Sequence, residues 1–478
     1  MPAKILAENS AATLAEFEQD TLRVAQVLRE RGVGLGDRVL LKAGNSIAYV
    51  SVLFALMHVG ASVVLVDQQE KQEATGSIIR RAGTKLVLVD DDAPVPTDTD
   101  PVYLYELIAS APDLAVTDER LSFDAWSDLD DALIMWSSGS TGEPKGIVKN
   151  GGRMLANLER NAHHMGHRAD DVLLPLLPFS HQYGLSMVLI AWIVQGSLVI
   201  APYKRADRAL RMAGHSGATV LDATPATYRS MLNIIRQRPA LAEALGAVRM
   251  FCSGAAPLDP ALVERYIERF GLPLLDSYGS TEAGNVAFAT SDNAVSCGQV
   301  MDGLRVRVVD DEGNEVPAGE VGELLIETPD VMVGYLTPDG GIDPVDQSVF
   351  RTGDLGYLDA AGNLFVLGRK FAVHRNGYTL YPEIVERKAA AGGCSARIVP
   401  LPDERRGSSL VFFVEDEQQR DAAHWREVLD ELLPPYEQPN RVIVVDQFPL
   451  NRNGKPDKRR MTELAAEVQS VTENQQTS

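Results

Sequence analysis

The stretch ALIMWSSGSTGEPKGI, residues 132–147, decides how the rest of the sequence is understood. It begins with an apolar run that suits a buried strand, and it continues into a segment rich in hydroxyl side chains and glycine. Such a segment can direct hydroxyl and backbone N–H donors at an anion, and a lysine follows to add positive charge. The residues predicted to bind phosphate are Ser137, Ser138, Gly139, Ser140, Thr141, Gly142 and Lys145.

This loop differs from the P-loop, which ends in Gly-Lys-Ser/Thr. Here Pro144 precedes Lys145 and Gly146 follows it, so a different nucleotide chemistry is indicated. The alternative is a flexible surface linker, because serine and glycine are also common in linkers.

Composition narrows the classes of partner. The 478 residues are enough for several subdomains and a large core. Lys and Arg number 45 against 66 Asp and Glu, which gives a formal charge of −21 and argues against nucleic acid or an anionic membrane as the main partner. An anionic substrate would need a local positive pocket. Cys252, Cys297 and Cys394 lack metal-ligand spacing and are expected to be small buried side chains in a reducing cytoplasm.

No segment of the sequence predicts export or a membrane span. The N-terminus has no apolar core of signal-peptide length, so we expect a cytoplasmic protein. The longest apolar run, residues 184–202, is divided at residues 195–197 into a helix-like half and a strand-like half. A buried helix followed by a buried strand is therefore expected there.

The order of apolar patterns predicts the fold class. Helical and strand patterns alternate over residues 13–90, which indicates a largely parallel, helix-covered α/β sheet. Residues 91–130 show little periodicity and are expected to be an excursion. Short alternating runs after residue 298 predict a small antiparallel β subdomain. The last hundred residues alternate strands and helices again, as in a small α/β domain.

The loop SSGSTGEPKG resembles the phosphate-binding signature of the adenylate-forming superfamily, which includes acyl-CoA synthetases, stand-alone adenylation domains and luciferases. The motif YGSTE at residues 278–282 follows at a suitable distance and strengthens the resemblance. These enzymes activate a carboxylate as an acyl adenylate and usually pass the acyl group to a thiol. The resemblance implies a large N-terminal domain over residues 1–369, with the β subdomain at about 299–368, and a small mobile lid over residues 370–478.

The resemblance also assigns roles to residues. The small-residue turn Gly254-Ala255-Ala256 would lie along adenine, with Tyr278 stacking on the ring and Asp276 at its amino group. Asp354 and Arg369 would contact the ribose. The residues implied in catalysis are Lys455, Thr281 at the phosphates and Glu282, which would help to hold Mg²⁺. ATP and Mg²⁺ are the implied cofactors.

The segment PFSHQYGL, residues 178–185, is the main indication of substrate class. Enzymes of the superfamily that activate α-amino acids usually carry an aspartate here, and this segment has none, so an acyl or aryl acid is expected. For His181 the alternative is an ordinary hydrogen-bonded core histidine. The candidates for contact with the acyl group are Phe179, His181, Tyr183, Gly184, Gly279 and Asn285.

The hinge region leaves the acceptor open. Lys370 is the implied hinge, but the segment between Gly368 and Gly377 is one residue shorter than usual and lacks the common acidic residue. CoA or the phosphopantetheine of a separate carrier protein are the expected thiols. A carrier would act in trans, because the Gly392-Gly393-Cys394-Ser395 stretch lies within the lid and is not a carrier site.

Alternatives to an acid–thiol ligase stay open at this point. One is a stand-alone amino-acid adenylating enzyme, and another forms the adenylate but uses a non-thiol nucleophile. A protein that binds nucleotide without catalysis is disfavoured by the presence of Glu282, Asp354 and Lys455. Family members act in primary metabolism and in natural-product biosynthesis, so the acid, the pathway and the oligomeric state do not follow from the sequence.

Overall fold

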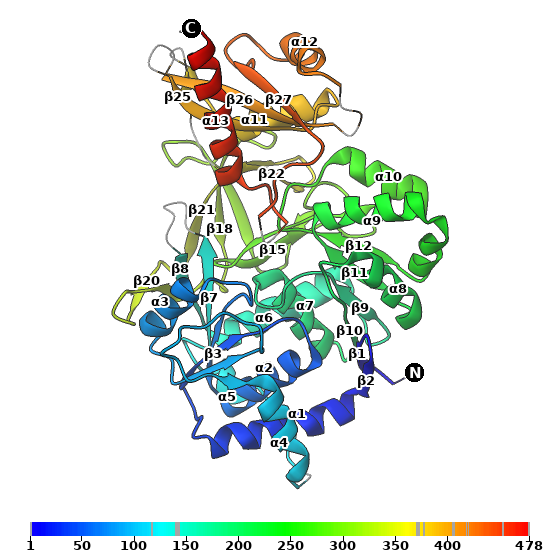
Figure 1. Ribbon diagram of the computed structural model, residues 1–478, viewed down its shortest axis with the longest axis vertical. Coiled ribbons are helices and arrows are strands. Elements are labelled where there is room, and N and C mark those ends of the chain that lie inside the picture. The colour runs from blue at the N-terminus through cyan, green and yellow to red at the C-terminus, as the bar shows by residue number, and fades with distance from the viewer. Residues whose placement is uncertain are drawn as a thin grey trace. The chain divides into compact units, whose positions relative to one another are not determined.

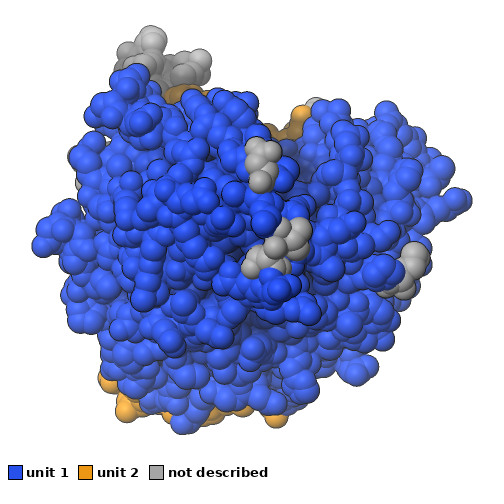
Figure 2. Space-filling model, turned by 90° about the horizontal axis from the view of Figure 1, so that it is seen from below, with its two compact units in different colours: residues 1–307, 325–351, 361–364 blue, residues 308–324, 352–360, 365–478 orange. Residues whose placement is uncertain are grey.

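The structure is a computed structural model, and it describes residues 2–115, 118–138, 144–369, 373–375, 378–403, 407–416, 418, 420–451 and 454–476. The chain divides into two compact units (Figure 2). Unit 1 consists of residues 1–307, 325–351 and 361–364. Unit 2 consists of residues 308–324, 352–360 and 365–478. Each unit is described by itself below.

The first sheet of unit 1 is almost entirely parallel, as expected for a helix-covered α/β fold. Its one antiparallel pair joins the N-terminal strands β1 and β2 at the edge. The strands, in spatial order, are β13 (Leu274–Leu275), β12 (Met250–Ser253), β11 (Val220–Ala223), β9 (Val172–Pro175), β10 (Ser197–Ile200), β1 (Lys4–Ala7) and β2 (Ser10–Thr13).

The second sheet of unit 1 is parallel at one side and antiparallel at the other. Pairing is parallel from β7 through β4, β3 and β5 to β6, and antiparallel from β7 through β8 and β19 to β20. The strands, in spatial order, are β20 (Ile342–Pro344), β19 (Gly334–Leu336), β8 (Pro144–Lys149), β7 (Leu133–Ser138), β4 (Ser62–Leu65), β3 (Arg38–Lys42), β5 (Leu86–Val89) and β6 (Val102–Tyr103).

Helices cover both faces of these sheets (Figure 1). The main core lies between the two sheets and contains α1 (Leu14–Glu30), α2 (Ile47–Val59), α6 (Gly151–Met165) and α7 (Gln182–Ile193). The far face of the first sheet is covered by α8 (Ala206–Ser216), α9 (Pro225–Gln237) and α10 (Pro260–Phe270), and that of the second sheet by α3 (Gln72–Ala82). Because α2 and α7 are enclosed by protein, their sequences are apolar on nearly every side.

Local sequence signals set several of these boundaries. Thr13 caps α1 by accepting from the Glu16 N–H, and the Glu16 carboxylate accepts from the Thr13 N–H in return. Gly60 ends α2 with φ 75°, a conformation that glycine adopts without steric cost. The apolar run over residues 184–202 forms helix α7 and strand β10, as predicted. No helix among the described residues is long and apolar enough to cross a membrane.

Two parts of unit 1 differ from the expected pattern. The hairpin β1–β2 was not predicted, because its strands are short and carry little alternation. The expected excursion over residues 91–130 contains β6 and three short helices that pack beside α1 and α2. These helices are α4 (Leu104–Ser110), η1 (Ala111–Asp113) and α5 (Asp124–Ser127).

Two further sheets follow, and the strand pairs of the first of them are antiparallel. A small sheet contains β14 (Ser277–Ser280), β15 (Gly284–Phe288) and β16 (Gln299–Val300). Another contains β17 (Arg305–Val309), β18 (Gly322–Glu327), β21 (Val349–Leu358) and β22 (Leu364–Arg369). The division into compact units passes through the last group, and the predicted domain boundary after residue 369 stays a prediction.

The C-terminal part of unit 2 is a small α/β layer. Its sheet has α11 and α12 on one face and α13 on the other (Figure 1). Its elements are β23 (Val373–Arg375), β24 (Tyr378–Leu380), α11 (Pro382–Ala391), β25 (Ala396–Asp403), β26 (Gly407–Glu415), α12 (Ala422–Leu432), β27 (Arg441–Val445) and α13 (Lys458–Gln476).

Candidate active site

The predicted phosphate loop connects two antiparallel strands of the second sheet. Strand β7 ends at Ser138, and β8 brings Lys145 opposite Ser137. Lys145 is exposed, with its Nζ 5.2 Å from the centre of the Tyr335 ring. The side chains of Ser137 and Ser138, and the loop residues Gly139, Ser140, Thr141 and Gly142, lie outside the described residues. Phosphate binding by this loop therefore stays a prediction.

The predicted adenine turn follows strand β12 and packs closely against two other segments. The Ser277 hydroxyl donates a 2.8 Å hydrogen bond to the Ser253 carbonyl. A Cβ added at Gly254 would lie 2.6 Å from Ser277 Oγ and 3.0 Å from Tyr183 Cε1. Only glycine fits at that position without displacing its neighbours. Ala255 adopts φ 66°, which is unusual for a residue with a Cβ and gives the turn its sharp change of direction.

The second predicted adenine segment starts strand β14. Desolvation raises the pKa of the Asp276 carboxyl to about 7, while hydrogen bonds from the Ser277 N–H and the Cys297 thiol act in the opposite direction. Tyr278 is half-buried and lies on β14 just before a register shift. Ala256 is half-buried in the other turn. The Ser277–Ser253 hydrogen bond therefore brings together two predicted adenine segments from different parts of the chain.

Thr281 and Glu282 lie in the turn between β14 and β15, and both are half-buried. The Thr281 carbonyl accepts a 2.8 Å hydrogen bond from Lys149 Nζ, and the Glu282 carbonyl accepts one of 2.7 Å from the Met332 N–H. No cluster of three or more His, Cys, Asp or Glu side chains suited to a metal ion occurs in the part of the chain that is described. A single carboxylate nevertheless fits Mg²⁺, which is commonly held by one or two carboxylates with substrate phosphates and water.

His181 immediately precedes α7 and pairs with an acidic residue from another segment. Its Nε2 lies 3.3 Å from Asp67 Oδ2, and its side chain is 31% exposed. Desolvation acts to raise the pKa of Asp67, but hydrogen bonds from His181 and from the Gln69 N–H bring it below its ordinary value. His181 is thus a partly exposed histidine paired with a carboxylate, and not one enclosed in the core.

Tyr183 donates a 2.9 Å hydrogen bond from its hydroxyl to Asp222 Oδ1. Asp222 is 2% exposed, and its burial raises the pKa to about 7, opposed by the hydrogen bond from Tyr183. Burial also raises the pKa of Tyr183 well above its ordinary value. Because the Tyr183 ring also contacts the Gly254 turn, a predicted acyl residue and the predicted adenine turn lie side by side.

The other predicted acyl residues occupy varied positions. Phe179 is completely buried and packs on Tyr49, with ring centres 6.1 Å apart. A Cβ at Gly184 would lie 2.2 Å from the Pro178 carbonyl oxygen, and one at Gly279 would lie 2.7 Å from the Gly284 oxygen. Close backbone approach therefore requires both glycines. Asn285 is the second residue of β15, close to the Thr281–Glu282 turn.

Within unit 2, the structure joins the two predicted ribose residues. Arg369 Nε lies 3.1 Å from Asp354 Oδ1, and Arg369 Nη1 donates a 2.6 Å hydrogen bond to the Thr352 carbonyl. The Asp354 N–H donates to Thr352 Oγ1 at 2.9 Å. Asp354 on β21 and Arg369 at the end of β22 thus form one ion-paired group.

Lys455 lies in a tight turn before α13. The Asn451 N–H donates to the Lys455 carbonyl at 2.7 Å, and the Lys455 N–H donates to Asn451 Oδ1 at 3.0 Å. Gly454 adopts φ 72° within this turn. Lys455 is exposed. The predicted hinge residue Lys370 lies outside the described residues.

Little in the sequence indicates the polar residues that hold these groups. Asp67 and Asp222 pair with His181 and Tyr183, and Lys149 binds the Thr281 carbonyl. Lys149 had one usable signal, since it is a charged residue at the end of an apolar strand. The aspartates had none, because their partners lie 114 and 39 residues away in sequence.

Comparison with known proteins identifies the family. A model of AMP-binding enzymes matches residues 2–336, and a model of their C-terminal domain matches residues 395–455. A 2-succinylbenzoate–CoA ligase of Enterococcus faecalis is 30% identical over 351 residues, which cover 71% of each chain. A fatty acid–[acyl-carrier-protein] ligase, ScoC of Streptomyces coeruleorubidus, is 29% identical over 490 residues, covering 94% of this chain and 91% of the relative.

A solved structure of similar fold supports the same family assignment. ATP-bound MatB from Rhodopseudomonas palustris superimposes with a TM-score of 0.86 at 26% identity, covering 98% of this chain and 97% of MatB. The expected α/β fold and the resemblance to the adenylate-forming superfamily are confirmed. The chain belongs to the AMP-binding enzyme family.

Proposed function

We propose that this protein activates an acyl or aryl acid, and not an α-amino acid, as its adenylate and transfers the acyl group to the thiol of CoA or of a carrier-protein phosphopantetheine. The general class follows from the family and the named relatives: the chain is an AMP-forming acid–thiol ligase. ATP and Mg²⁺ are the proposed cofactors, and MatB was solved with ATP bound. The finer parts of the proposal concern the acid, the acceptor and the role of each residue.

One observation carries the proposal. The Ser277 hydroxyl bonds to the Ser253 carbonyl, and Tyr183 packs against Gly254. This proximity supports the predicted roles of the three segments, two at adenine and one at the acyl group. An enzyme that joins a carboxylate to the α-phosphate of ATP needs the nucleotide and the acid beside each other. This arrangement lies entirely within unit 1.

In the proposed first step, a carboxylate oxygen of the acid attacks the α-phosphorus of ATP, and the bond to pyrophosphate breaks. Both reactants are anionic, so the residues must offset charge as well as orient the groups. Lys455 is proposed to contact the carboxylate and the α-phosphate, and the loop from Ser137 to Lys145 the departing pyrophosphate. Mg²⁺, bound with the help of Glu282, would supply further positive charge to the phosphates. Asp354 and Arg369 are proposed to hold the ribose.

In the proposed second step, a thiol attacks the acyl carbon of the adenylate, and AMP leaves. Movement of the lid about Lys370 is proposed to remove Lys455 and admit the thiol. Both acceptor types occur among the relatives, since one is named a CoA ligase and another a carrier-protein ligase. The shortened hinge segment that could distinguish them includes residues outside those described, so both acceptors are retained. A cytoplasmic location also stays a prediction.

The contacts of the acyl segment support a non-amino acid. Two carboxylates do lie beside it, but each has its own partner: Asp67 pairs with His181, and Asp222 accepts from Tyr183. The raised pKa of Asp222 also makes it a poor permanent anion for holding a substrate ammonium. For the acid, the alternative is an α-amino acid.

The deciding experiment is a pyrophosphate-release screen of the full chain with ATP, Mg²⁺ and a panel of fatty, aryl and amino acids. Each acid is tested alone, with CoA and with a phosphopantetheinylated carrier protein. The products are identified by mass spectrometry, and reactions without acid or without protein serve as controls.

Release stimulated by a fatty or aryl acid, with acyl-CoA or acyl-carrier product, is the expected result. Stimulation by α-amino acids alone would overturn the substrate assignment. Adenylate formation that neither thiol accelerates would overturn the acceptor assignment and support a different nucleophile. ATP binding with no turnover on any acid would indicate a nucleotide-binding protein without catalysis.

A further inference from the structure

Buried polar groups of neighbouring segments form hydrogen bonds with the turn that carries Thr281 and Glu282. The segment Thr281–Asn285 runs from the end of β14 into the first two residues of β15, and its last residue is the predicted acyl residue Asn285. Side chains from β8 and α6 bind its two ends, and the Met332 N–H binds the Glu282 carbonyl at 2.7 Å. All of these groups belong to unit 1.

Lys149 holds the first end. This lysine is the last residue of β8 and is only 2% exposed, and its Nζ donates a 2.8 Å hydrogen bond to the Thr281 carbonyl. A buried ammonium is costly unless it is paired. Desolvation lowers the pKa of Lys149 to about 8, whereas the carboxylates of Asp330 and Glu282 are near enough to raise it in the opposite direction.

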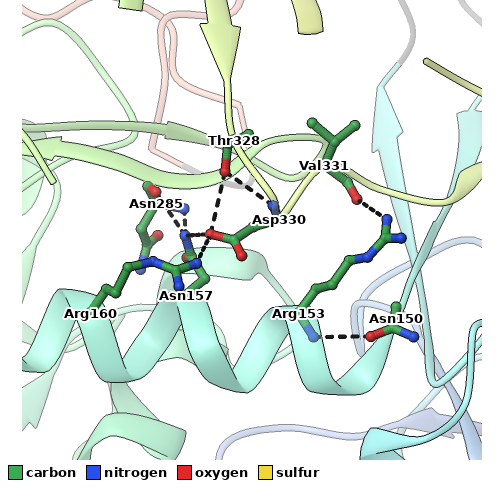
Figure 3. Close-up of polar contacts among 8 residues, drawn as sticks. All are labelled: Asn150, Arg153, Asn157, Arg160, Asn285, Thr328, Asp330 and Val331. Carbon is green, nitrogen blue, oxygen red and sulfur yellow. Dashed lines mark hydrogen bonds and ion pairs between the residues drawn. The ribbon is translucent and has the colours of Figure 1, made fainter. Parts of the chain in front are cut away.

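Asn157 on α6 holds the second end. Its Oδ1 accepts from the Asn285 N–H, and its Nδ2 donates to the Asn285 carbonyl, each at 2.9 Å (Figure 3). Both backbone groups of one residue are therefore fixed by a single side chain. The second proton of the same Nδ2 is directed to Asp330 Oδ2, also at 2.9 Å.

Asp330 holds the side chain of Asn157 in place. It is 2% exposed and accepts from Asn157 and from the Thr328 hydroxyl, and it pairs with Arg160 (Figure 3). Its charge also acts on Lys149. A buried carboxylate with this many partners has one defined position, and it therefore also fixes the position of the Asn157 side chain that donates to it.

We propose that Lys149, Asn157 and Asp330 form a clamp that fixes the Thr281–Asn285 segment in the geometry required to bind Mg²⁺–ATP. The clamp residues are positioning residues, since they act through the backbone of the segment. This inference rests on the proposed roles of Thr281 and Glu282. It extends them by naming the residues on which those roles depend.

The clamp acts on the phosphate end of the nucleotide and not on the adenine end. Its bonds go to Thr281 and Asn285, whereas the Gly254 turn is held by Ser277 and Tyr183. Loss of the clamp is therefore expected to weaken binding of Mg²⁺–ATP much more than binding of AMP. A general loss of stability would weaken both ligands alike.

The test compares Lys149→Met with Lys42→Met. Lys42 is a matched control, because it is fully buried on β3 of the same sheet and donates to the Glu70 carbonyl and Thr75 Oγ1 at 2.7 and 2.8 Å. Dissociation constants for AMP and for Mg²⁺–ATP are measured by calorimetry, together with thermal stability. Asn157→Ser is the second clamp variant, and it keeps the inference testable if Lys149→Met does not fold.

For Lys149→Met and Asn157→Ser we expect at least fivefold weaker binding of Mg²⁺–ATP, with AMP binding changed by less than twofold. Lys42→Met should lower thermal stability but leave the ratio of the two constants as in the wild type. In a double-mutant cycle, Lys149→Met should cost little further ATP affinity once Glu282→Gln is present.

An unchanged ratio of the two constants in both clamp variants would overturn the inference, and so would full additivity in the cycle. The binding measurements on the wild type also distinguish failure of this inference from failure of the proposed function. A wild-type protein that binds Mg²⁺–ATP but turns over no acid refutes the function alone. A wild-type protein that does not bind Mg²⁺–ATP refutes both.

Discussion

Replacing Asp222 by asparagine should remove a fall in stability that the wild type undergoes as pH rises to about 7. The carboxyl of Asp222 is 2% exposed, and burial raises its pKa from 3.8 to about 7. Asparagine has nearly the same shape, and its Oδ1 can still accept the Tyr183 hydroxyl that lies 2.9 Å from Asp222 Oδ1. The substitution therefore removes the ionisable group and keeps the hydrogen bond.

The magnitude follows from proton linkage. The folded protein holds the Asp222 proton more tightly than the unfolded chain, so this group favours the fold at low pH and loses that contribution as pH rises through about 7. Between about pH 5.5 and about pH 8.5 the loss is about 2 kcal/mol of unfolding free energy. Burial raises the pKa of Tyr183 and of Cys252 well above their ordinary values, so neither neighbour ionises in this range.

The assay is urea unfolding of both proteins across this pH range at constant ionic strength. The difference in unfolding free energy between Asp222→Asn and the wild type should grow by about 2 kcal/mol from the acid to the alkaline end. Asp207→Asn is the control, because this half-buried residue pairs with Arg205 and Arg211, which lower its pKa below the ordinary value against the effect of desolvation. A difference that does not change with pH would refute the assigned ionisation of Asp222.

Three further outcomes concern the proposed chemistry. Lys455→Ala should lower acid-dependent pyrophosphate release at least a hundredfold with little change in thermal stability, and near-normal release would refute its role. Gly254→Ala should weaken AMP binding and lower the unfolding free energy by about 1–3 kcal/mol, because the new Cβ would lie 2.6 Å from Ser277 Oγ. An unchanged AMP affinity, measured by calorimetry, would contradict this. Asp354→Asn should raise the KM for ATP more than it lowers kcat, and a change in kcat alone would argue against a ribose contact.

Much of the fold could be predicted because it depends on local patterns. The division of the apolar run into α7 and β10 follows from Gln195 and Gly196, which interrupt it, and Gln195 indeed adopts φ 55°. The hairpin β1–β2 was missed because each strand has four residues, with partners supplied by the distant strand β10. The short helices within residues 91–130 pack beside α1 and α2, and no periodic pattern of their own marks them.

The candidate site likewise contains residues that local sequence motifs predict and residues that they do not. Short motifs predicted residues such as Tyr278, Glu282 and Asp354, because the residues of each motif are adjacent in sequence. The groups that hold them lie far away: Lys149 is 132 residues from Thr281, and Asn157 is 128 from Asn285. Such pairs become visible only when the fold brings β8 and α6 beside the β14–β15 turn.

The interleaving of the two compact units has a consequence for synthesis on the ribosome. Unit 1 needs residues up to 364, whereas unit 2 already includes residues 308–324 and 352–360. A nascent or truncated chain that ends near residue 364 therefore carries all of unit 1 together with two pieces of unit 2 whose remaining partners are missing. Exposed strand edges of this kind promote aggregation. Premature termination in the last quarter of the gene should thus yield a poorly tolerated product, and not a simple one-unit protein.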